Sequence, residues 1–259
     1  MTHIIAVTNQ KGGVGKTTTS VNLAAALAAT KQRVLLVDLD SQGNATMGVG
    51  VNKHELTRSS RDALLNLCRA EEATVILSEL GFSLMGANAD MTEAETRLRD
   101  MPEGELRMKK VLGEISARYD YIVMDCPPAL SKLTVNALVA ADGVLIPMQC
   151  EYYALEGLSA LLDTIEQIKK VINPKLEVAG LLRTMFDARN NLAEQVSEQL
   201  ISHFGEKVYR TVIPRNVRLA EAPSHGLPVT TYDPSSTGAR AYLALAVEIL
   251  WRDKKRAAA

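Results

Sequence analysis

The sequence predicts an α/β fold built as a single domain, a doubly wound and mostly parallel sheet flanked by helices. Three observations predict it. Apolar runs of strand length alternate with helix-length runs along nearly the whole chain. The strand-like runs are apolar at almost every position, as expected of strands buried on both faces of a parallel sheet. Polar motifs follow these runs, at the ends where ligands bind in such sheets.

The expected strands are short apolar runs that together could fill the middle of one sheet. In chain order they lie at 3–7, 33–38, 121–125, 144–148, 178–182 and 208–213. The expected helices lie between them and repeat apolar residues at helical spacing. They are 18–29, 106–118, 155–171, 192–204 and 239–251.

One P-loop-type domain is expected to span residues 1–259, because a chain of this length can bury one substantial core. Two small domains are the alternative. Residues 52–107 are richer in charge, with a helix-like stretch at 93–100, and we expect them to form a peripheral elaboration. The ends, 1–2 and 252–259, are expected to be loose.

Charge and composition exclude several classes. The 29 basic and 30 acidic residues nearly cancel, so any contact with DNA requires a local patch. No run approaches the roughly 20 apolar residues that cross a bilayer, and a first strand at residue 3 leaves no room for a signal peptide. Cys68, Cys126 and Cys150 are too scattered for a disulfide framework or a zinc site. We therefore expect a cytoplasmic protein with Cys126 and Cys150 in its core.

A phosphate-binding loop lies between the first strand and the first helix. Residues 10–19 read Gln-Lys-Gly-Gly-Val-Gly-Lys-Thr-Thr-Thr, and backbone N–H groups in this loop can surround phosphate oxygens. We expect Lys16 to reach the β- and γ-phosphates and the Thr17 hydroxyl to bind Mg²⁺. The residues expected to contact the nucleotide here are Lys11, Gly12, Gly13, Val14, Gly15, Lys16, Thr17 and Thr18.

The loop departs from the ordinary motif, which requires glycine where this chain has Gln10. The pattern Lys-Gly-Gly-Val-Gly-Lys-Thr resembles the deviant phosphate loop of the ParA/MinD family of ATPases. The resemblance implies that Lys11 reaches across a dimer interface to the nucleotide of the partner subunit. It therefore implies ATP, Mg²⁺ and an ATP-dependent homodimer. The alternative is that Lys11 is one more solvated loop lysine.

Three aspartates follow two of the expected strands. Asp125 ends a strand and precedes Cys-Pro-Pro, so it fits the Walker B acid that holds Mg²⁺, although such an acid can also cap a turn. Alternation places Asp38 and Asp40 on the same side of the chain. Residues 38–46 resemble the first switch of the family, which implies that Asp38 contacts the metal indirectly and that Asp40 orients the attacking water. The family commonly has proline where this chain has Ser41, and a more flexible switch could alter the hydrolysis rate.

The expected metal-site residues are Thr17, Asp38 and Asp125, and those expected to act in hydrolysis are Lys11, Lys16 and Asp40. The sequence offers no obvious glutamine or arginine finger, which favours slow turnover that a partner accelerates.

The resemblance also implies an adenine site. In residues 213–216, Pro214 would pack on the base and Asn216 would bond its polar edge. Met185 could form a second wall, with a core position as its alternative. In residues 149–158, which also resemble the family, Glu151 could face the nucleotide or Lys11 of the partner subunit. Equally, Glu151 could begin the next helix with a favourable charge.

Basic residues in the C-terminal half are candidates for sequence-independent DNA contacts. They are Arg183, Arg189, Lys207, Arg210, Arg215, Arg218 and Arg240. The resemblance to chromosomal ParA proteins favours Arg189, and Arg218 comes second; a solvated surface charge is the alternative for each. Aromatic residues make up 4% of the chain, so base stacking on single strands is not expected.

Taken along nearly the whole chain, the resemblance implies a ParA/Soj-type partitioning ATPase. Such a protein binds nonspecific double-stranded DNA as an ATP dimer, associates with the nucleoid and is released when a ParB-like centromere-binding protein stimulates hydrolysis. One alternative is an orphan ParA-like ATPase that positions a non-DNA cargo. A MinD-like membrane ATPase would need an apolar amphipathic C-terminal helix, whereas residues 249–256 soon become charged, so no membrane partner is expected. An iron–sulfur reductase would need two suitably placed cysteines per subunit.

Overall fold

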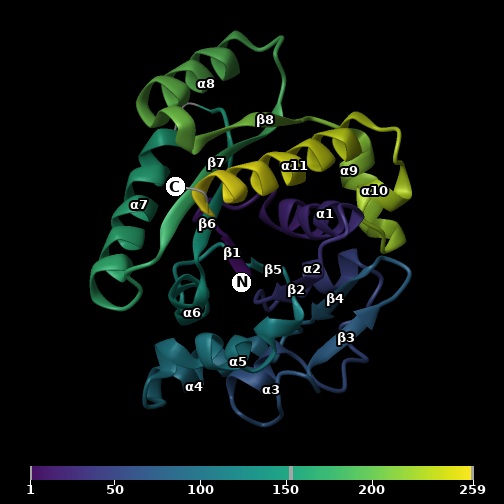
Figure 1. Ribbon diagram of the computed structural model, residues 1–259, viewed down its shortest axis with the longest axis vertical. Helices are drawn as coiled ribbons and strands as arrows, with labels where there is room; N and C mark the ends of the chain where they lie inside the picture. The colour runs from purple at the N-terminus through teal and green to yellow at the C-terminus, as the bar shows by residue number, and fades with distance from the viewer. Residues whose placement is uncertain (1, 152–153, 258–259) are drawn as a thin grey trace.

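The computed structural model describes residues 2–151 and 154–257 as one layered α/β domain around an eight-stranded sheet. The strand order is β3-β4-β2-β5-β1-β6-β7-β8, and every neighbouring pair is parallel except β3 and β4. The strands are β1 His3–Val7, β2 Val34–Asp38, β3 Thr74–Leu77, β4 Phe82–Met85, β5 Tyr121–Asp125, β6 Gly143–Gln149, β7 Glu177–Phe186 and β8 Val208–Pro214. The predicted fold class is confirmed (Figure 1).

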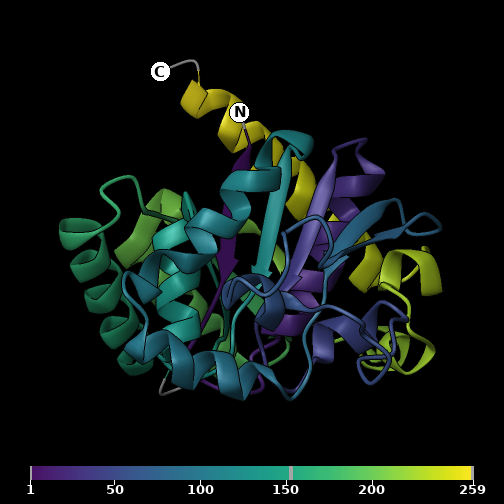
Figure 2. The same cartoon turned by 90° about the horizontal axis from the view of Figure 1, so that it is seen from below.

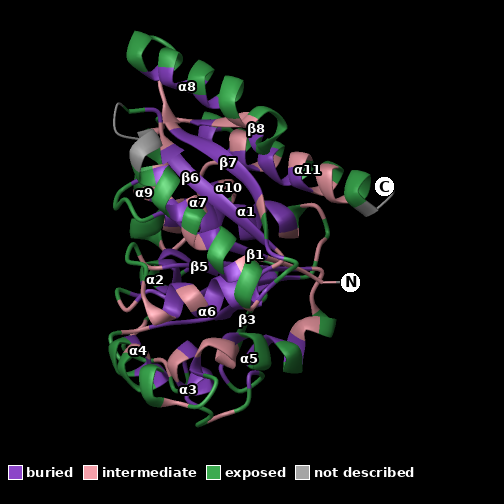
Figure 3. Ribbon diagram, turned by 90° about the vertical axis from the view of Figure 1, so that its left-hand side faces the viewer, coloured by how far each residue is buried: buried purple, intermediate pink, exposed green. Residues whose placement is uncertain are grey.

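Helices cover both faces of the sheet. They are α1 Lys16–Ala29, α2 Asn44–Gly48, α3 Ser60–Leu64, α4 Met91–Asp100, α5 Arg107–Ile115, α6 Lys132–Ala140, α7 Ala154–Val171, α8 Asn191–Phe204, α9 Val217–Glu221, α10 Val229–Tyr232 and α11 Thr237–Ala257. On one face α1 and α11 lie side by side, and α4 to α8 pack on the other (Figure 1). The strands and the inner helix faces are buried while the outer helix faces are exposed (Figure 3).

Two hydrophobic cores result from the alternation of side chains along the strands. In β1, Ala6 packs into the core with α4 to α8, whereas Ile5 and Val7 pack into the core with α1 and α11. The six predicted strands and five predicted helices are all present, with bounds that differ by a few residues at most in the strands. The helix predicted at 239–251 is longer in the structure, where α11 spans Thr237–Ala257. Cys126 and Cys150 are buried, as expected.

The expectation of a peripheral elaboration at 52–107 is wrong for β4. This strand lies between β3 and β2, and all four of its residues are buried. The run is only four residues long and stands among charged neighbours, so its sequence pattern does not mark it as a core strand. Its position matters because the chain after β4 reaches the same edge of the sheet as the ends of β2 and β5.

The expectation of a loose C-terminal end is wrong for residues 252–257, which belong to α11. The Asp253 carboxylate accepts a hydrogen bond from the Tyr121 hydroxyl and lies 2.7 Å from His3 Nδ1. Arg252 donates to the Val208 carbonyl at 3.0 Å. Two charged residues near this end, Arg252 and Asp253, thus have partners on the sheet. At the N-terminal end, the Thr2 hydroxyl likewise bonds backbone carbonyls.

None of the helices in the described ranges is long and apolar enough to span a membrane.

Candidate nucleotide-binding site

Three neighbouring strands end together at one edge of the sheet. In the parallel register, Asp125 at the end of β5 lies beside Val7 of β1 and beside Asp38 of β2. The phosphate loop follows Val7, so the loop and the two carboxylates share the carboxyl edge of the sheet. This is the place where ligands bind in open α/β sheets.

The phosphate loop has the backbone conformation that its glycines allow. Gly13 and Gly15 have φ angles of 74° and 86°, in the left-handed region that favours glycine. A β-carbon at Gly12 or Gly13 would meet nothing within 4 Å, so open space lies in front of this stretch of backbone. Gly15 caps α1, whose positive N-terminal end therefore faces the loop. The cradle has the form that a phosphate group requires.

Lys16 lies in the interior of the loop. Its side chain is buried, and its ammonium donates to the Lys11 carbonyl at 3.0 Å. Burial lowers the pKa of Lys16, and the negative charges of Asp125 and Asp40 oppose that shift. The ammonium is thus held across the loop, where phosphate oxygens would replace a carbonyl as its acceptor.

Asp125 is buried and organised by two hydroxyls of α1. Thr17 donates to one carboxylate oxygen and Ser20 to the other, each at 2.8 Å. Burial raises the pKa of Asp125, and the neighbouring negative charge of Asp38 raises it further. The structure brings Thr17 and Asp125, two of the predicted metal-site residues, into direct contact.

Asp38 anchors the switch segment to the sheet. One carboxylate oxygen accepts from the backbone N–H and the hydroxyl of Thr46, at 2.9 and 2.7 Å, and the other accepts from the Asp40 N–H at 3.1 Å. Burial raises the pKa of Asp38, against these hydrogen bonds. Asp40 is buried and its carboxylate accepts from the Gln42 N–H, which closes the turn that contains Ser41.

Sequence reasoning missed three hydroxyl residues that organise these acids. Ser20 lies one helical turn after Thr17, and this spacing alone could have pointed to it. The Thr46 hydroxyl also accepts from the Ala87 N–H, after β4, at 2.9 Å. Ser60 donates to the Asp38 carbonyl at 2.7 Å. No sequence signal links Ser60 to Asp38, because the contact depends on the unpredicted strand β4.

Lys11 forms an ion pair with Glu151 of its own subunit. Lys11 Nζ lies 2.6 Å from Glu151 Oε2, and the two side chains are 45% and 52% exposed. The predicted contact of Glu151 is with the nucleotide or with Lys11 of the partner subunit, whereas the ion pair in the structure joins Lys11 and Glu151 of one chain. The alternative in which Glu151 begins the next helix is not seen in the described residues, where α7 starts at Ala154. Lys11 stands at the surface of the loop while Lys16 occupies its interior.

The residues predicted to hold the base gather beside the loop. Met185 is half-buried, has a φ of 50° that is uncommon for a side-chain-bearing residue, and its Cε lies 3.8 Å from where a Gly15 β-carbon would stand. Thr184 donates to the Val14 carbonyl at 2.8 Å, which ties β7 to the loop. On neighbouring β8, Pro214 pairs with Phe186, the residue after Met185.

Asn216 carries a hydrogen-bonding atom that the described residues leave without a partner. Its amide nitrogen donates to the Thr237 hydroxyl at 2.7 Å, while its buried oxygen Oδ1 has no partner. A buried acceptor in this state is costly unless a donor reaches it. An exocyclic amino group of adenine is such a donor, so the residue fits the predicted contact.

The candidate DNA residues do not form one cluster. Arg183 is buried and donates to Ser197 and to the carbonyls of Tyr209 and Arg210, so its assignment as a DNA candidate is wrong. Lys207 and Arg210 lie at the start of β8, at the opposite edge from the phosphate loop.

Arg189 and Arg218 lie beyond the carboxyl ends of β7 and β8. Arg189 is 90% exposed and forms a two-pronged ion pair with Asp187, and this pairing holds the pKa of Asp187 well down, at about 2. Arg218 pairs with Glu221 at 2.7 Å and with Asp233 at 3.3 Å. Both arginines are thus on the same edge of the sheet as the phosphate loop.

The residues present fit a nucleotide with Mg²⁺. Two buried acids side by side leave this edge with an excess of negative charge, which a divalent cation would offset. Across the described residues, no group of three or more acids, histidines or cysteines converges to hold a metal unaided. Mg²⁺ commonly takes one or two protein oxygens and completes its shell with phosphate oxygens and water. Thr17 and Asp125 would supply the protein side of such a shell.

Known proteins resemble this chain along its whole length. A protein-family model described as an AAA domain matches residues 2–178. The chain is 51% identical over 249 residues to the sporulation initiation inhibitor protein Soj of Bacillus subtilis, covering 96% of this chain and 98% of Soj. It is 46% identical over 258 residues to the chromosome partitioning protein ParA of Caulobacter vibrioides, covering 99% and 97%. The crystal structure of cobyrinic acid a,c-diamide synthase from Mycobacterium smegmatis with bound ADP and magnesium has a TM-score of 0.86 at 35% identity, covering 98% of this chain and 96% of that one.

Proposed function

This chain belongs to the ParA/Soj family of chromosome-partitioning ATPases, and we propose that it binds nonspecific double-stranded DNA as an ATP-dependent homodimer. Hydrolysis stimulated by a ParB-like centromere-binding protein would release it from DNA. The cycle would move or position a chromosome origin or a plasmid on the nucleoid. The observation that carries the proposal is that the phosphate loop holds two lysines in different places, Lys16 in its interior and Lys11 at its surface.

Inside the loop, the residues would hold ATP for attack by water. Lys16 would contact the β- and γ-phosphates. Thr17 and Asp125 would hold Mg²⁺, which supplies charge neutralisation to the phosphates when bound. Asp40 would orient the attacking water, and Asp38 would keep the switch segment in place through its hydrogen bonds to Thr46. Positioning and charge stabilisation account for most of the catalysis of phosphoryl transfer.

At the surface of the loop, Lys11 is available to a second subunit. Its pairing with Glu151 is exposed and therefore weak enough to exchange for a phosphate group. Reaching the nucleotide of the partner subunit would require the ammonium to leave Glu151. This exchange would couple the presence of ATP to dimerisation, because phosphate carries more charge than the single carboxylate that it replaces.

The DNA-binding surface would form from Arg189 and Arg218 of both subunits. Each arginine is held by a carboxylate of its own subunit, so DNA phosphates would compete with those acids. Such contacts give binding that is independent of sequence and sensitive to salt. Two subunits joined at the carboxyl edge of the sheet would bring both pairs of arginines together.

The test is DNA binding by the full chain with ATP, with ADP and without nucleotide. We expect tight binding with ATP, and we expect Arg189→Glu to lose it while still binding ATP. Lys109→Glu, an exposed charge on α5, is the matched control and should bind DNA like the wild type. DNA affinity that is the same in all three nucleotide states would overturn the proposed switch.

A further inference from the structure

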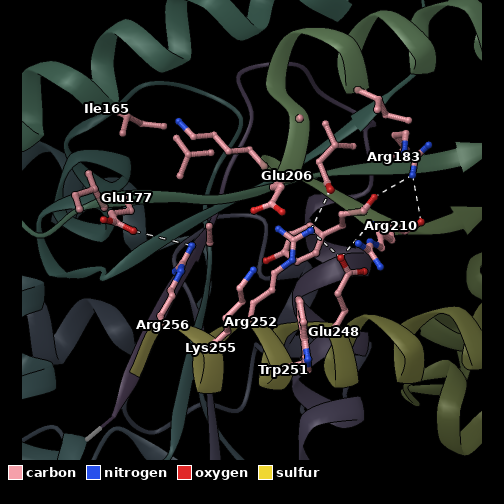
Figure 4. Close-up of a pocket in the computed structure, with 18 of the residues that line it drawn as sticks. Ile165, Glu177, Arg183, Glu206, Arg210, Glu248, Trp251, Arg252, Lys255 and Arg256 are labelled. Carbon is pink, nitrogen blue, oxygen red and sulfur yellow. Dashed lines mark hydrogen bonds and ion pairs between the residues drawn. The ribbon is translucent and has the colours of Figure 1, made fainter. Parts of the chain in front are cut away.

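A groove of about 1000 Å³ lies at the opposite edge of the sheet from the phosphate loop (Figure 4). Its floor is the beginning of β7 and β8, including Val178 and Val208. Its walls come from α7, from the turn before β8, and from the C-terminal half of α11. Figure 4 shows α11 in the lower part of the view with the strands above it, and charged side chains of both reach into the space between them.

A bulge in β8 shapes this groove. The strand carries two more residues than β7 between two of their paired positions. The Glu248 carboxylate accepts from the backbone N–H groups of Arg210 and Thr211, each at 2.9 Å. From the other side, Arg183 donates to the carbonyls of Tyr209 and Arg210, at 2.9 and 3.2 Å. Because β8 is the edge strand of the sheet, a bulge of this kind disrupts its row of backbone hydrogen-bonding groups and disfavours the addition of another strand. An occupant would therefore bind through side chains.

Arg183 places a buried positive charge beside the groove. Its side chain is 8% exposed, and all its hydrogen bonds go to neutral oxygens. Within the described ranges, no carboxylate lies at ion-pair distance from it, and its Nε is buried without a partner. Arginine stays protonated even when buried. This edge therefore carries a fixed charge that a nearby anion would stabilise.

The other lining side chains add to the positive charge. Seven basic and four acidic residues line the groove. Two of the acids are already engaged, Glu248 by Arg252 at 2.7 Å and Glu177 by Arg256 at 4.0 Å. In the part of the chain that the structure describes, Lys169, Lys207, Arg210 and Lys255 have no carboxylate at ion-pair distance. The groove thus has several cations to offer to an acidic ligand.

Large apolar side chains stand in the same groove. Val247 and Trp251 lie one helical turn apart on α11 and are 58% and 57% exposed. Ile201, at the end of α8, is exposed beside them. The Lys255 ammonium lies 5.5 Å from the centroid of the Trp251 ring, within cation–π range. A partner that covered this stripe would bury apolar area as well as neutralise charge.

We propose that this groove is a docking site for an acidic segment of a partner protein, one that also carries bulky apolar side chains. Carboxylates of the segment would face Lys207, Arg210 and Lys255, and its apolar side chains would cover Val247 and Trp251. The combination of cations with an apolar stripe favours such a segment over duplex DNA. Glu166 and Glu206 in the lining would repel a continuous row of phosphates, and the apolar stripe would have nothing to contact.

Selection from a random peptide library tests the proposal with the full chain. The library is panned against the wild type and depleted against the double variant Lys207→Glu/Arg210→Glu. Both positions are exposed, so the variant should fold. Arg58→Glu/Lys109→Glu carries the same charge change on exposed positions elsewhere and is the matched control. Trp251 is the single tryptophan of the chain, so its emission reports on the groove directly.

We expect the selected peptides to be rich in Asp, Glu and bulky apolar residues. A synthetic copy should shift the Trp251 emission saturably and bind the groove variant about tenfold more weakly, with the control variant unchanged. A copy with glutamine at every acidic position should lose most of its affinity. The proposal is overturned if no acidic peptide distinguishes the two variants, if duplex DNA displaces the peptide at equal charge, or if dilution of the chain alone changes the Trp251 emission, which would mark self-association.

Discussion

Replacing Glu151 with glutamine should strengthen ATP-dependent dimerisation. In the single subunit, Lys11 is held by Glu151 at 2.6 Å. If Lys11 must reach the nucleotide of the partner subunit, this ion pair is lost when the dimer forms. Glutamine keeps the shape of the side chain but removes the charge that competes for Lys11. The variant monomer would therefore lose no ion pair between Lys11 and residue 151 when the dimer forms.

The size of the effect follows from the exposure of the pair. Each side chain is about half exposed, and a pair of this kind contributes about 0.2–1 kcal/mol. Because each of the two subunits gives up one pair, the dimer gains about 0.4–2 kcal/mol, which lowers its dissociation constant by about 2- to 30-fold. Raising the salt concentration should shrink the difference.

Sedimentation equilibrium with a non-hydrolysable ATP analogue measures the change. The control is the same substitution in a Lys11→Ala background, where Glu151→Gln should have no effect, because its partner is already missing. Weaker dimerisation of the single variant would refute the reasoning. It would mean that Glu151 pairs with Lys11 of the partner subunit in the dimer, so that the ion pair is exchanged between subunits and not lost.

Three further predictions concern the site and the sheet. Lys16→Ala should reduce ATP affinity by at least about tenfold with the fold retained, measured by fluorescent-nucleotide titration; undiminished affinity would remove Lys16 from the phosphates. Thr46→Val leaves Ala87 N–H without its acceptor and removes a hydrogen bond to Asp38, so urea unfolding should show a loss of about 1–3 kcal/mol; a neutral change would mean that water replaces the hydroxyl. Hydrogen bonds from Arg33 lower the pKa of Asp120 to about 2, so the stability from this pair is present above about pH 4 and is lost as pH falls toward 2. Asp120→Asn should flatten the acid limb of a stability–pH profile in that window, and an unaltered limb would contradict this.

Local pattern was enough to predict the strands that carry the site, and therefore the position of the acids. Asp38 and Asp125 each end a continuous apolar run, and parallel strands that end together bring such residues to one edge. The glycines of the phosphate loop were equally readable, because their backbone conformation has few alternatives. These features depend on burial and on backbone geometry, which leave a periodic signal in the sequence.

The features of the site that the sequence did not predict depend on strand register and on contacts between distant segments. Ser60 contacts Asp38, and Thr46 contacts Ala87, where the short strand β4 enters the sheet beside β2. The sequence predicts Arg183 as a surface charge. In the structure it is buried beside the bulge of the neighbouring strand β8 and donates hydrogen bonds to backbone carbonyls there. Lys11 and Glu151 lie 140 positions apart, and no local pattern shows whether they meet within one subunit or between two.

The anchoring of α11 has a practical consequence for anyone who labels this protein. Because Asp253 lies against His3, the beginning of β1 and the last turns of α11 lie together at the side of the sheet that is remote from the phosphate loop (Figure 2). A fluorescent protein or affinity tag fused at either end would leave the proposed dimer face open. The same fusion would stand next to Lys255 and Arg256 at the mouth of the groove. A tagged chain would therefore hydrolyse ATP like the untagged chain, but the tag would block partners from the groove and binding would be missed. An internal label on an exposed loop would be the safer choice.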